Sequence, residues 1–344
     1  MKKLLDVISV GSANIDTIAR IDQFPEADGL APVQSLKTSF GGSAANTAIA
    51  CSKLGLKTGF LGKIGSDNAG RELFMNFQKN RVDTNGLIYN PEVPSGQVFI
   101  AVENLGQKIM FSFPGAPQTL SREDVNTRIS YLAKAYIVHL ASLKSTDPFE
   151  EIAAHAVEGD YLLSLNPGTT IASLGYERLQ PILDSLDILI VSRNELQSMF
   201  GHSSIEDNVK YCFSKTAVKM LVVTFGVRGS NFYFPDVTGN IVPIFKVQTV
   251  NTTGAGDAFS AGFFATFLTC FKEYIENSGA DCEPCRTTFE AFANGMKEDN
   301  ECLSHCLLFA NATAAFVVQG DGAQVNLPTY EMVDEFMSSQ ASGE

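Results

Sequence analysis

Short β-branched runs alternate with stretches of helical spacing along most of this chain, and this alternation constrains the fold more than any other feature. The runs are Asp6–Val10, Thr58–Lys63, Ala135–Leu140, Tyr161–Leu165, Asp187–Val191 and Lys219–Thr224. The stretches are Ala44–Leu54, Ala69–Asn80, Phe149–Val157, Ile171–Leu183 and Ile205–Lys215. Strands that alternate with helices form a mainly parallel sheet covered by helices on both faces. We therefore predict a three-layer α/β/α fold whose strand carboxyl ends share one ligand-binding edge.

Two segments interrupt the alternation and predict a small separate sheet. Residues 18–40 contain Pro25, Gly29 and Pro32 and show no helical period. Residues 95–113 have the pattern of a β-hairpin with a turn at Asn104–Gly106. We predict that residues from about 15–40 and 95–113 form a β-sheet lid over the ligand cleft. Its aromatic side chains either face the ligand or pack the hairpin onto the body: Phe99, Phe111 and Phe113.

Charge and hydropathy exclude several kinds of partner. The chain has 25 Lys+Arg against 38 Asp+Glu, a net charge of −13, which argues against a broad nucleic-acid surface. No apolar run approaches the roughly 18 residues that span a bilayer, and Asp6 interrupts the first apolar stretch. We expect a cytoplasmic protein without a membrane partner. The 344 residues fit one domain over 1–337 and a flexible tail at 338–344.

Four of the seven cysteines fall in two close pairs near the end of the chain. Cys51, Cys212 and Cys270 lie in apolar contexts and are expected to be buried thiols. The spacing of the two pairs resembles a structural zinc site made by Cys282, Cys285, Cys302 and Cys306. The alternative is four reduced cysteines in a peripheral insertion at about residues 272–301.

The strongest local motif is Gly254-Ala255-Gly256-Asp257, which lies between a strand-like run and an apolar helix. Glycines at a helix start leave backbone N–H groups exposed. These groups point outward at the positive end of the helix dipole, which suits a bound anion. The Asp257 carboxylate could take a proton from a hydroxyl that attacks phosphorus. Simple helix capping explains Asp257 but not the glycines beside it. The motif is not a Walker A loop.

Two weaker motifs lie near the N-terminus. Gly41-Gly42 and Asn46 lead into a predicted helix, Thr47–Leu54. Glycines at this place allow a ligand to approach the backbone closely. Asn14 and Asp16 alternate on one strand face, an arrangement that suits a diol. The alternatives are an ordinary turn and a solvated strand end.

Together these motifs resemble the ribokinase-like, or PfkB, family of carbohydrate and nucleoside kinases over nearly the whole chain. Further matches are Pro114-Gly115-Ala116, Asn194-Glu195, Thr224-x-Gly226-x-x-Gly229, Ala310-Asn311-Ala312 and Gly322-Ala323. The resemblance implies Asp257 as the catalytic base and Gly254, Ala255 and Gly256 as the anion hole. It implies that substrate hydroxyls are held by Asn14, Asp16, Gly42 and Asn46. It implies a nucleotide site at Asn194, Thr224, Gly226, Gly229 and Asn311.

The resemblance also implies ATP and Mg²⁺ as cofactors, but the chain departs from the family pattern in several places. Asn251 replaces an Asp that often helps to hold a monovalent cation, so potassium activation is in doubt. Gln197 replaces a Glu that organises Mg²⁺. Ser43 stands where ribokinase usually has Lys, and residues 139–142 lack a sugar-binding Glu, which argues against free ribose.

We therefore expect an ATP-dependent kinase that phosphorylates a primary hydroxyl of a sugar or a sugar-containing small molecule. A nucleoside kinase of the same fold is the first alternative. A non-catalytic ligand-binding homologue is the second, and Asn251 and Gln197 motivate it. A dinucleotide dehydrogenase is excluded because no Gly-x-Gly-x-x-Gly follows the first strand. An open lid edge would allow a homodimer.

Overall fold

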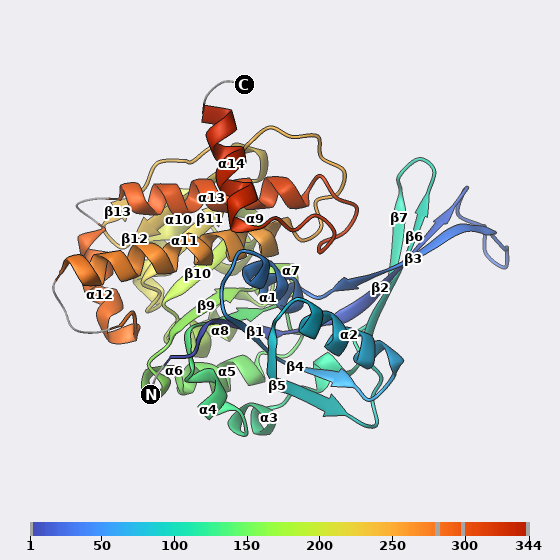
Figure 1. The fold of residues 1–344 in the computed structure, drawn as a ribbon, viewed down its shortest axis with the longest axis horizontal. Helices are drawn as coiled ribbons and strands as arrows, with labels where there is room; N and C mark the ends of the chain where they lie inside the picture. The colour runs from blue at the N-terminus through green and yellow to red at the C-terminus, as the bar shows by residue number, and fades with distance from the viewer. Residues whose placement is uncertain (1–2, 279–282, 297–299, 342–344) are drawn as a thin grey trace.

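The computed structural model describes residues 3–278, 283–296 and 300–341, and its body is a nine-stranded sheet between two helical layers (Figure 1). The strand order is β13-β12-β11-β10-β9-β8-β1-β4-β5, parallel except where β12 pairs with its neighbours. The strands are β1 Leu5–Gly11, β4 Thr58–Gly65, β5 Asp83–Asn90, β8 Ala135–Ala141, β9 Leu162–Asn166, β10 Ile188–Ser192, β11 Met220–Thr224, β12 Ser230–Phe234 and β13 Val237–Thr238. The predicted α/β/α class and the six predicted β-branched strands are confirmed, whereas residues 243–250 of the strand-like run predicted before Asn251 form no strand.

Helices cover both faces of this sheet. One face carries α1 Ser43–Lys53, α2 Asn68–Lys79, α11 Ala255–Asn277, α12 Arg286–Gly295, α13 Glu301–Val317 and α14 Tyr330–Ala341. The other carries α3 Arg122–Asn126, α4 Ile129–Leu132, α5 Asp147–Ala154, α6 Ala156–Gly159, α7 Gly168–Ala172, α8 Gly175–Leu183, α9 Arg193–Phe200 and α10 Ile205–Lys215. No helix of the described segments combines the length and the apolar character needed to cross a bilayer.

The central strands are apolar throughout because both of their faces are buried. In β10, Ile188 and Ile190 pack toward the α11 layer, whereas Leu189 and Val191 pack toward the opposite layer. This alternation follows from the period of two in a β-strand, whose successive side chains point to opposite faces. The sheet therefore separates two cores, and its carboxyl-terminal edge remains open for a ligand.

Two predicted helices are each broken in two. The stretch predicted at Phe149–Val157 forms α5 and α6, with a tighter turn at His155, whose N–H bonds to the carbonyl of Ile152. The stretch predicted at Ile171–Leu183 forms α7 and α8, which are separated before Gly175. Gly175 has φ of +78°, a left-handed conformation that cannot continue a right-handed helix. Hydrophobic spacing alone does not reveal such breaks.

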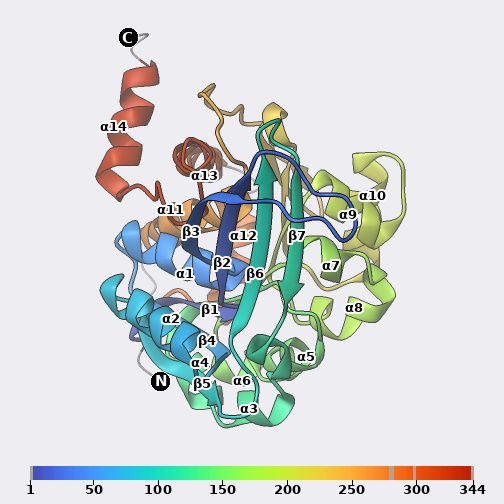
Figure 2. The same ribbon diagram turned by 90° about the vertical axis from the view of Figure 1, so that its right-hand side faces the viewer.

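A second, four-stranded sheet projects from one end of the body and confirms the predicted lid (Figures 1 and 2). Its order is β3-β2-β6-β7, from β3 Val33–Gly41, β2 Asn14–Ile21, β6 Gly96–Glu103 and β7 Lys108–Phe113. The predicted hairpin is the β6–β7 pair. Only two residues separate the end of β1 from the start of β2, so the second sheet continues directly from the carboxyl-terminal edge of the large sheet.

The region after α11 differs from the sequence-based prediction. The predicted insertion contains α12, which is anchored by an ion pair of 3.1 Å between Arg286 and the fully buried Asp187. Cys270, predicted to be a free thiol, forms a disulfide with Cys302. Residues 338–341, predicted to belong to a flexible tail, continue helix α14. The spacing of the cysteines gave no sign of a pairing between residues that are 32 positions apart.

Candidate active site

The Gly-Ala-Gly-Asp motif forms the start of α11, as predicted. Gly254 has φ of +84°, and a Cβ atom at this position would lie 2.5 Å from the Cβ of Ala323. Both the backbone conformation and the close contact therefore require glycine. The Ala255 N–H bonds to the Thr252 carbonyl at 3.2 Å, and the Gly256 and Asp257 N–H groups have no backbone acceptor among the described residues. These two groups are the donors that the helix start offers to an anion.

Asp257 is held from both sides by residues of α1. The hydroxyl of Ser43 donates to Oδ1 of Asp257, and the Asn46 amide donates to Oδ2 at 2.8 Å. Burial raises the pKa of Asp257 to about 6, against the opposing effect of these two hydrogen bonds, and Glu195 raises it further. A carboxyl group with this pKa is mostly ionised at neutral pH and close to the range in which a general base works best. Ser43 was not among the predicted site residues.

The two glycines before α1 allow close packing. Gly42 has φ of +96°, and a Cβ atom there would lie 2.4 Å from the Ser12 carbonyl oxygen. A Cβ atom on Gly41 would lie 2.5 Å from Oδ2 of Asp16. The glycines therefore let α1 begin directly against the β1–β2 connection. This contact brings Ser43 and Asn46 to Asp257 across a separation of more than 200 residues.

Asn14 and Asp16 form a hydrogen-bonded pair at the base of the lid. The Asn14 amide donates to Oδ1 of Asp16, and burial raises the pKa of Asp16 to about 6. Asn14 lines a cavity, described next, whereas Asp16 lies behind it and is not among the lining residues. The structure thus brings the predicted pair together and exposes only Asn14 to the cavity.

Three cavities follow one another along the edge of the sheet and share lining residues. The lid cavity has a volume of about 280 Å³ and is lined by residues that include Asn14, Gln97, Phe113, Gln118, Ser142 and Lys144. The junction cavity, about 360 Å³, is lined by residues that include Ser43, Ser142, Asn166, Glu195, Gly256 and Asp257. The helix cavity, about 520 Å³, is lined by residues that include Thr224, Gly226, Gly229, Phe245, Lys246 and Asn311. Asp257 therefore lies at the centre of a continuous path.

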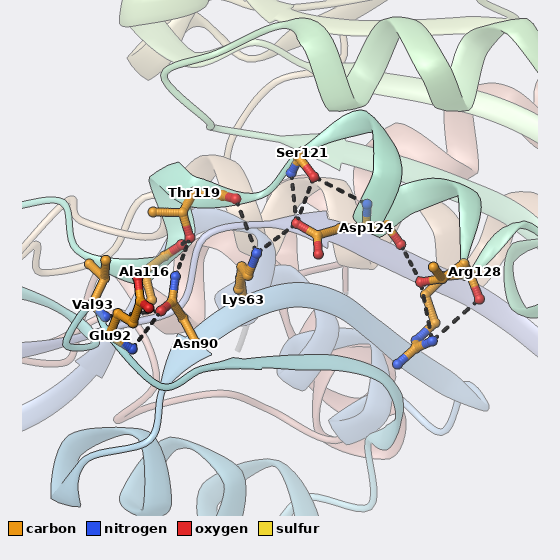
Figure 3. A network of polar contacts seen from close by, with 10 residues as sticks. Lys63, Asn90, Glu92, Val93, Ala116, Thr119, Ser121, Asp124 and Arg128 are labelled. Carbon is orange, nitrogen blue, oxygen red and sulfur yellow. Dashed lines mark hydrogen bonds and ion pairs between the residues drawn. The ribbon is translucent and has the colours of Figure 1, made fainter.

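The floor of the lid cavity is braced by a polar network under the connection from β7 to α3 (Figure 3). Lys63 of β4 donates to the Thr119 carbonyl at 3.2 Å and to Asp124 at 2.7 Å, and Asn90 of β5 donates to the Thr119 hydroxyl at 2.9 Å. These contacts hold the short 3-10 turn Ala116–Thr119 against the body. That turn supplies Pro117 and Gln118 to the cavity wall.

Several predicted nucleotide-site residues line the helix cavity, and one does not. Thr224, Gly226 and Gly229 line it directly. Asn311 also lines it, but its amide donates to the carbonyls of Val242 and Pro243 at 3.1 Å, so it braces the wall. Asn194 lies at the exposed start of α9 and is absent from the lining of all three cavities. The neighbouring residue, Glu195, lines the junction cavity instead.

Other lining residues were not predicted from the sequence. In the junction cavity these are chiefly Asn166, Thr169 and Phe259. In the helix cavity they are chiefly Ile244, Phe245, Lys246 and Val318. Phe259 lies three residues after Gly256 on α11, and residues three apart share a helix face, so this position could have been inferred. Phe245 lies in the run that was predicted to be strand-like but forms neither strand nor helix, and the sequence did not indicate that this run lines a cavity.

The groups available to hold a divalent cation are few. Glu195 lines the junction cavity, and its Oε2 accepts a hydrogen bond from the Ser192 N–H at 2.8 Å, which leaves its second carboxylate oxygen available. Gln197 is exposed and lies outside the lining of the three cavities. A carboxylate beside a phosphate site fits Mg²⁺, which is usually bound by one or two carboxylates together with phosphate oxygens and water.

The predicted four-cysteine zinc set is not assembled by the described residues. Cys302 is bonded to Cys270, and these two sulfurs form a group with Cys306 rather than with Cys285. The Cys285 thiol instead contacts the hydroxyls of Thr287 and Thr288 at the start of α12. Cys282 lies outside the described residues. Cys51 and Cys212 are buried free thiols, as predicted.

Comparison with known proteins agrees with this geometry. Residues 4–330 match the family model described as "pfkB family carbohydrate kinase". The chain is 32% identical to an ATP-dependent ribose-1-phosphate kinase from Halopiger xanaduensis, over 77% of this chain and 86% of that protein.

Two solved structures also resemble the chain. One is the nucleoside kinase of Methanocaldococcus jannaschii, with 25% identity, a TM-score of 0.72 and coverage of 98% of this chain and 100% of that one. The other is Arabidopsis thaliana ribokinase complexed with ribose and ATP, with 25% identity, a TM-score of 0.75 and coverage of 98% and 99%.

Proposed function

The chain belongs to the pfkB family of carbohydrate kinases and is an ATP-dependent carbohydrate or nucleoside kinase, and we propose that it phosphorylates a primary hydroxyl of a sugar or a sugar-containing small molecule. The observation that carries this proposal is the position of Asp257, midway between the lid cavity and the helix cavity. An acceptor in the first and a nucleotide in the second would bring their reacting groups together at this carboxyl group.

In the proposed reaction, Asp257 takes the proton of the acceptor hydroxyl. The hydroxyl oxygen forms a bond to the γ-phosphorus as the bond from that phosphorus to the bridging oxygen breaks, and ADP leaves with the electron pair. The N–H groups of Gly256 and Asp257 stabilise the charge on the transferring phosphoryl group, together with Gly254, whose conformation sets their direction. The lid excludes water, whose attack would hydrolyse ATP.

The donor and the metal follow from the same site. We place ATP in the helix cavity, which is lined by the predicted nucleotide-site residues Thr224, Gly226 and Gly229. A ribokinase that resembles this chain is complexed with ATP. Mg²⁺ would be held by Glu195 and by phosphate oxygens, and when bound it neutralises charge on the phosphates. Asn251 accepts a hydrogen bond from the Thr253 N–H at 3.0 Å, so its side chain shapes the turn before the anion hole.

Two features of the lid cavity favour particular acceptors. Lys144 is the only basic residue among those that line it, and this favours an acceptor with an anionic group. A phosphorylated pentose has such a group, and one relative is named a ribose-1-phosphate kinase. Phe113 lines the same cavity and could stack on a nucleobase, which favours a nucleoside instead.

The test is a coupled ADP-release assay with ribose, fructose, ribose-1-phosphate and adenosine as acceptors. Turnover with at least one of them supports the proposal, and the preferred acceptor decides between the two features of the lid cavity. The Lys144→Ala variant serves as a matched probe. We expect a KM increase of at least tenfold for an anionic acceptor and little change for a neutral one, from the loss of one charged contact. Tight binding of an acceptor without any turnover would support the non-catalytic alternative.

A further inference from the structure

A line of side-chain amides runs from Asp257 to the outer helix α2. The Asn46 amide nitrogen donates to Oδ2 of Asp257 at 2.8 Å, and its oxygen accepts from the Gln324 amide at 2.8 Å. The Gln324 oxygen in turn accepts from the Asn76 amide nitrogen at 2.9 Å. Asn80, one turn further along α2, donates to the Asn76 oxygen at 3.1 Å. The line therefore joins α11, α1, the loop after α13 and α2.

Each link determines the orientation of the next. A side-chain amide has a donor end and an acceptor end, so reversing one member would place two donors or two acceptors opposite each other. Because Asn76 donates to the Gln324 oxygen, Gln324 must present its NH₂ group to Asn46. Asn46 must then present its own NH₂ group to Asp257. The direction of the hydrogen bond between Asn46 and Asp257 thus depends on Gln324, which does not itself contact Asp257.

We propose that Gln324 and Asn76 are positioning residues for the catalytic base, and that they act by holding Asn46 as a hydrogen-bond donor to Asp257. A donor favours the ionised carboxylate, whereas an acceptor would favour the protonated acid. Glu195, on α9, is the charged group that acts on Asp257, and it disfavours the ionised form. The amide line and the Ser43 hydroxyl oppose that effect and keep Asp257 able to accept a proton.

Neither positioning residue touches the space where substrates would bind. Gln324 and Asn76 are absent from the lining of the lid, junction and helix cavities. Both are half-buried side chains, and their amides are used within the line. The inference rests on the proposed role of Asp257 as the base, and the experiment is chosen to separate the two.

The decisive variant is Gln324→Glu. A carboxylate can only accept, so Asn46 would turn its NH₂ group toward position 324 and its oxygen toward Asp257. We expect the acidic limb of kcat/KM against pH to move upward by about one pH unit and kcat at pH 7 to fall about twofold, because about half of Asp257 would then be protonated at that pH. KM for ATP should remain unchanged. Gln324→Leu breaks the line without adding charge and should move the limb in the same direction by a smaller amount.

A second variant, at position 76, tests the proposal even if the substitutions at position 324 prevent folding. Asn76→Asp leaves the contact from Asn80 intact but reverses Gln324 by the same logic, so the limb should again move upward. Gln78→Glu is the matched control, because Gln78 is an exposed residue of α2 and the change adds the same charge. The control should retain the wild-type pH profile. Thermal unfolding of every variant checks that the folded protein is being compared.

The outcomes separate this inference from the proposed function. If Asp257→Asn retains turnover, the base assignment fails and the inference fails with it. If Asp257→Asn is inactive but both the Gln324 variants and Asn76→Asp keep the wild-type pH profile, only the amide line is refuted. A fall in kcat that is equal at every pH would indicate a merely structural role and would also refute it.

Discussion

Helix α11 has two ends with opposite characters (Figure 1). At its start, Gly254 and Gly256 leave backbone N–H groups open, and the Asp257 carboxyl is held by side chains from α1. At its far end, Phe271 packs on Phe292 of α12 with ring centroids 4.6 Å apart. The same end is bonded through Cys270 to α13.

The contrast teaches how one helix serves both chemistry and stability. The start is a polar arrangement with free space beside it, so changes there should alter turnover and leave folding nearly intact. The far end is filled by aromatic rings and closed by a covalent bond, so changes there should alter stability and leave the chemistry of the folded protein intact. Four variants test this division.

The largest expected effect is at Asp257. Asp257→Asn keeps the shape of the side chain but cannot accept the proton, so we expect kcat to fall by about 10²- to 10⁴-fold. Because asparagine has nearly the same size and shape as aspartate, the midpoint of thermal unfolding should stay close to that of the wild type. ATP affinity, measured by calorimetry, should also persist. Near-normal turnover would contradict the assignment of Asp257 as the base.

The second effect is at the disulfide. Cys302→Ser opens a loop of 32 residues and should lower the free energy of unfolding by about 3 to 4 kcal/mol under oxidising conditions. Denaturant titration measures this change, and kcat should not move. With a reducing agent present, the variant and the wild type should have nearly equal stability. A variant that is equally destabilised in both conditions would show that packing, not the bond, is responsible.

The third effect is at the anchor of α12. Arg286→Met leaves the fully buried Asp187 with the Lys219 ammonium, at 2.9 Å, and the Leu163 N–H, and should cost about 2 to 3 kcal/mol of stability. Arg178→Met is the control, because Arg178 pairs with Glu150 at the surface and should cost less than about 1 kcal/mol. Equal losses in the two variants, measured by denaturant unfolding, would contradict the importance of the buried pair.

The last effect depends on pH and lies at His139 of β8, whose ring contacts Phe264 in the middle of α11. His139 is fully buried, with its ring 5.0 Å from that of Phe264, and burial lowers its pKa to about 3 from the usual 6.5. The unfolded chain therefore binds a proton that the folded chain does not, so acid favours unfolding below pH 6.5. The wild type loses stability through this residue as the pH falls, and His139→Gln does not. The difference in the free energy of unfolding between the two proteins should therefore shrink by about 1.4 kcal/mol per pH unit between pH 6 and 4.

Comparison with the variant is needed because other groups act in the opposite direction. The pKa values of Asp16 and Asp257 are raised to about 6, so the folded protein binds protons at these groups before the unfolded chain does. Their contribution to stability increases as the pH falls through 6, and it is common to the wild type and the variant. Parallel stability curves for the two proteins would refute the role of His139.

Much of the fold could be predicted because the spacing of apolar residues along the chain indicates its strands and helices. Strands such as β10 are continuous apolar runs, and α1 and α10 have helical spacing of ordinary length. The features that were not predicted lie where the spacing of apolar residues carries no signal. The break before Gly175 depends on a left-handed conformation, and β5 and β12 lack the β-branched runs of their neighbours.

The candidate site was predictable to the extent that its residues lie in one short motif. Gly254 and Asp257 were identified because glycine and a first-turn carboxylate have local physical signatures. Ser43 was missed as a partner of Asp257, and Asn46 was expected to hold a substrate hydroxyl although it donates to Asp257. Glu195, not Asn194, faces the junction cavity, because the helical turn at the start of α9 decides which neighbour points inward.

By itself, the sequence determined the α/β alternation, the lid hairpin and the glycines at the start of α11. Each of these depends on the conformational preferences of residues close together in the chain. Only the tertiary structure decided that Cys270 pairs with Cys302 and that Gln324 reaches Asn46 across 278 positions. These contacts depend on how helices pack on the sheet, and short hydrogen bonds or a disulfide form only when that packing places two atoms within reach.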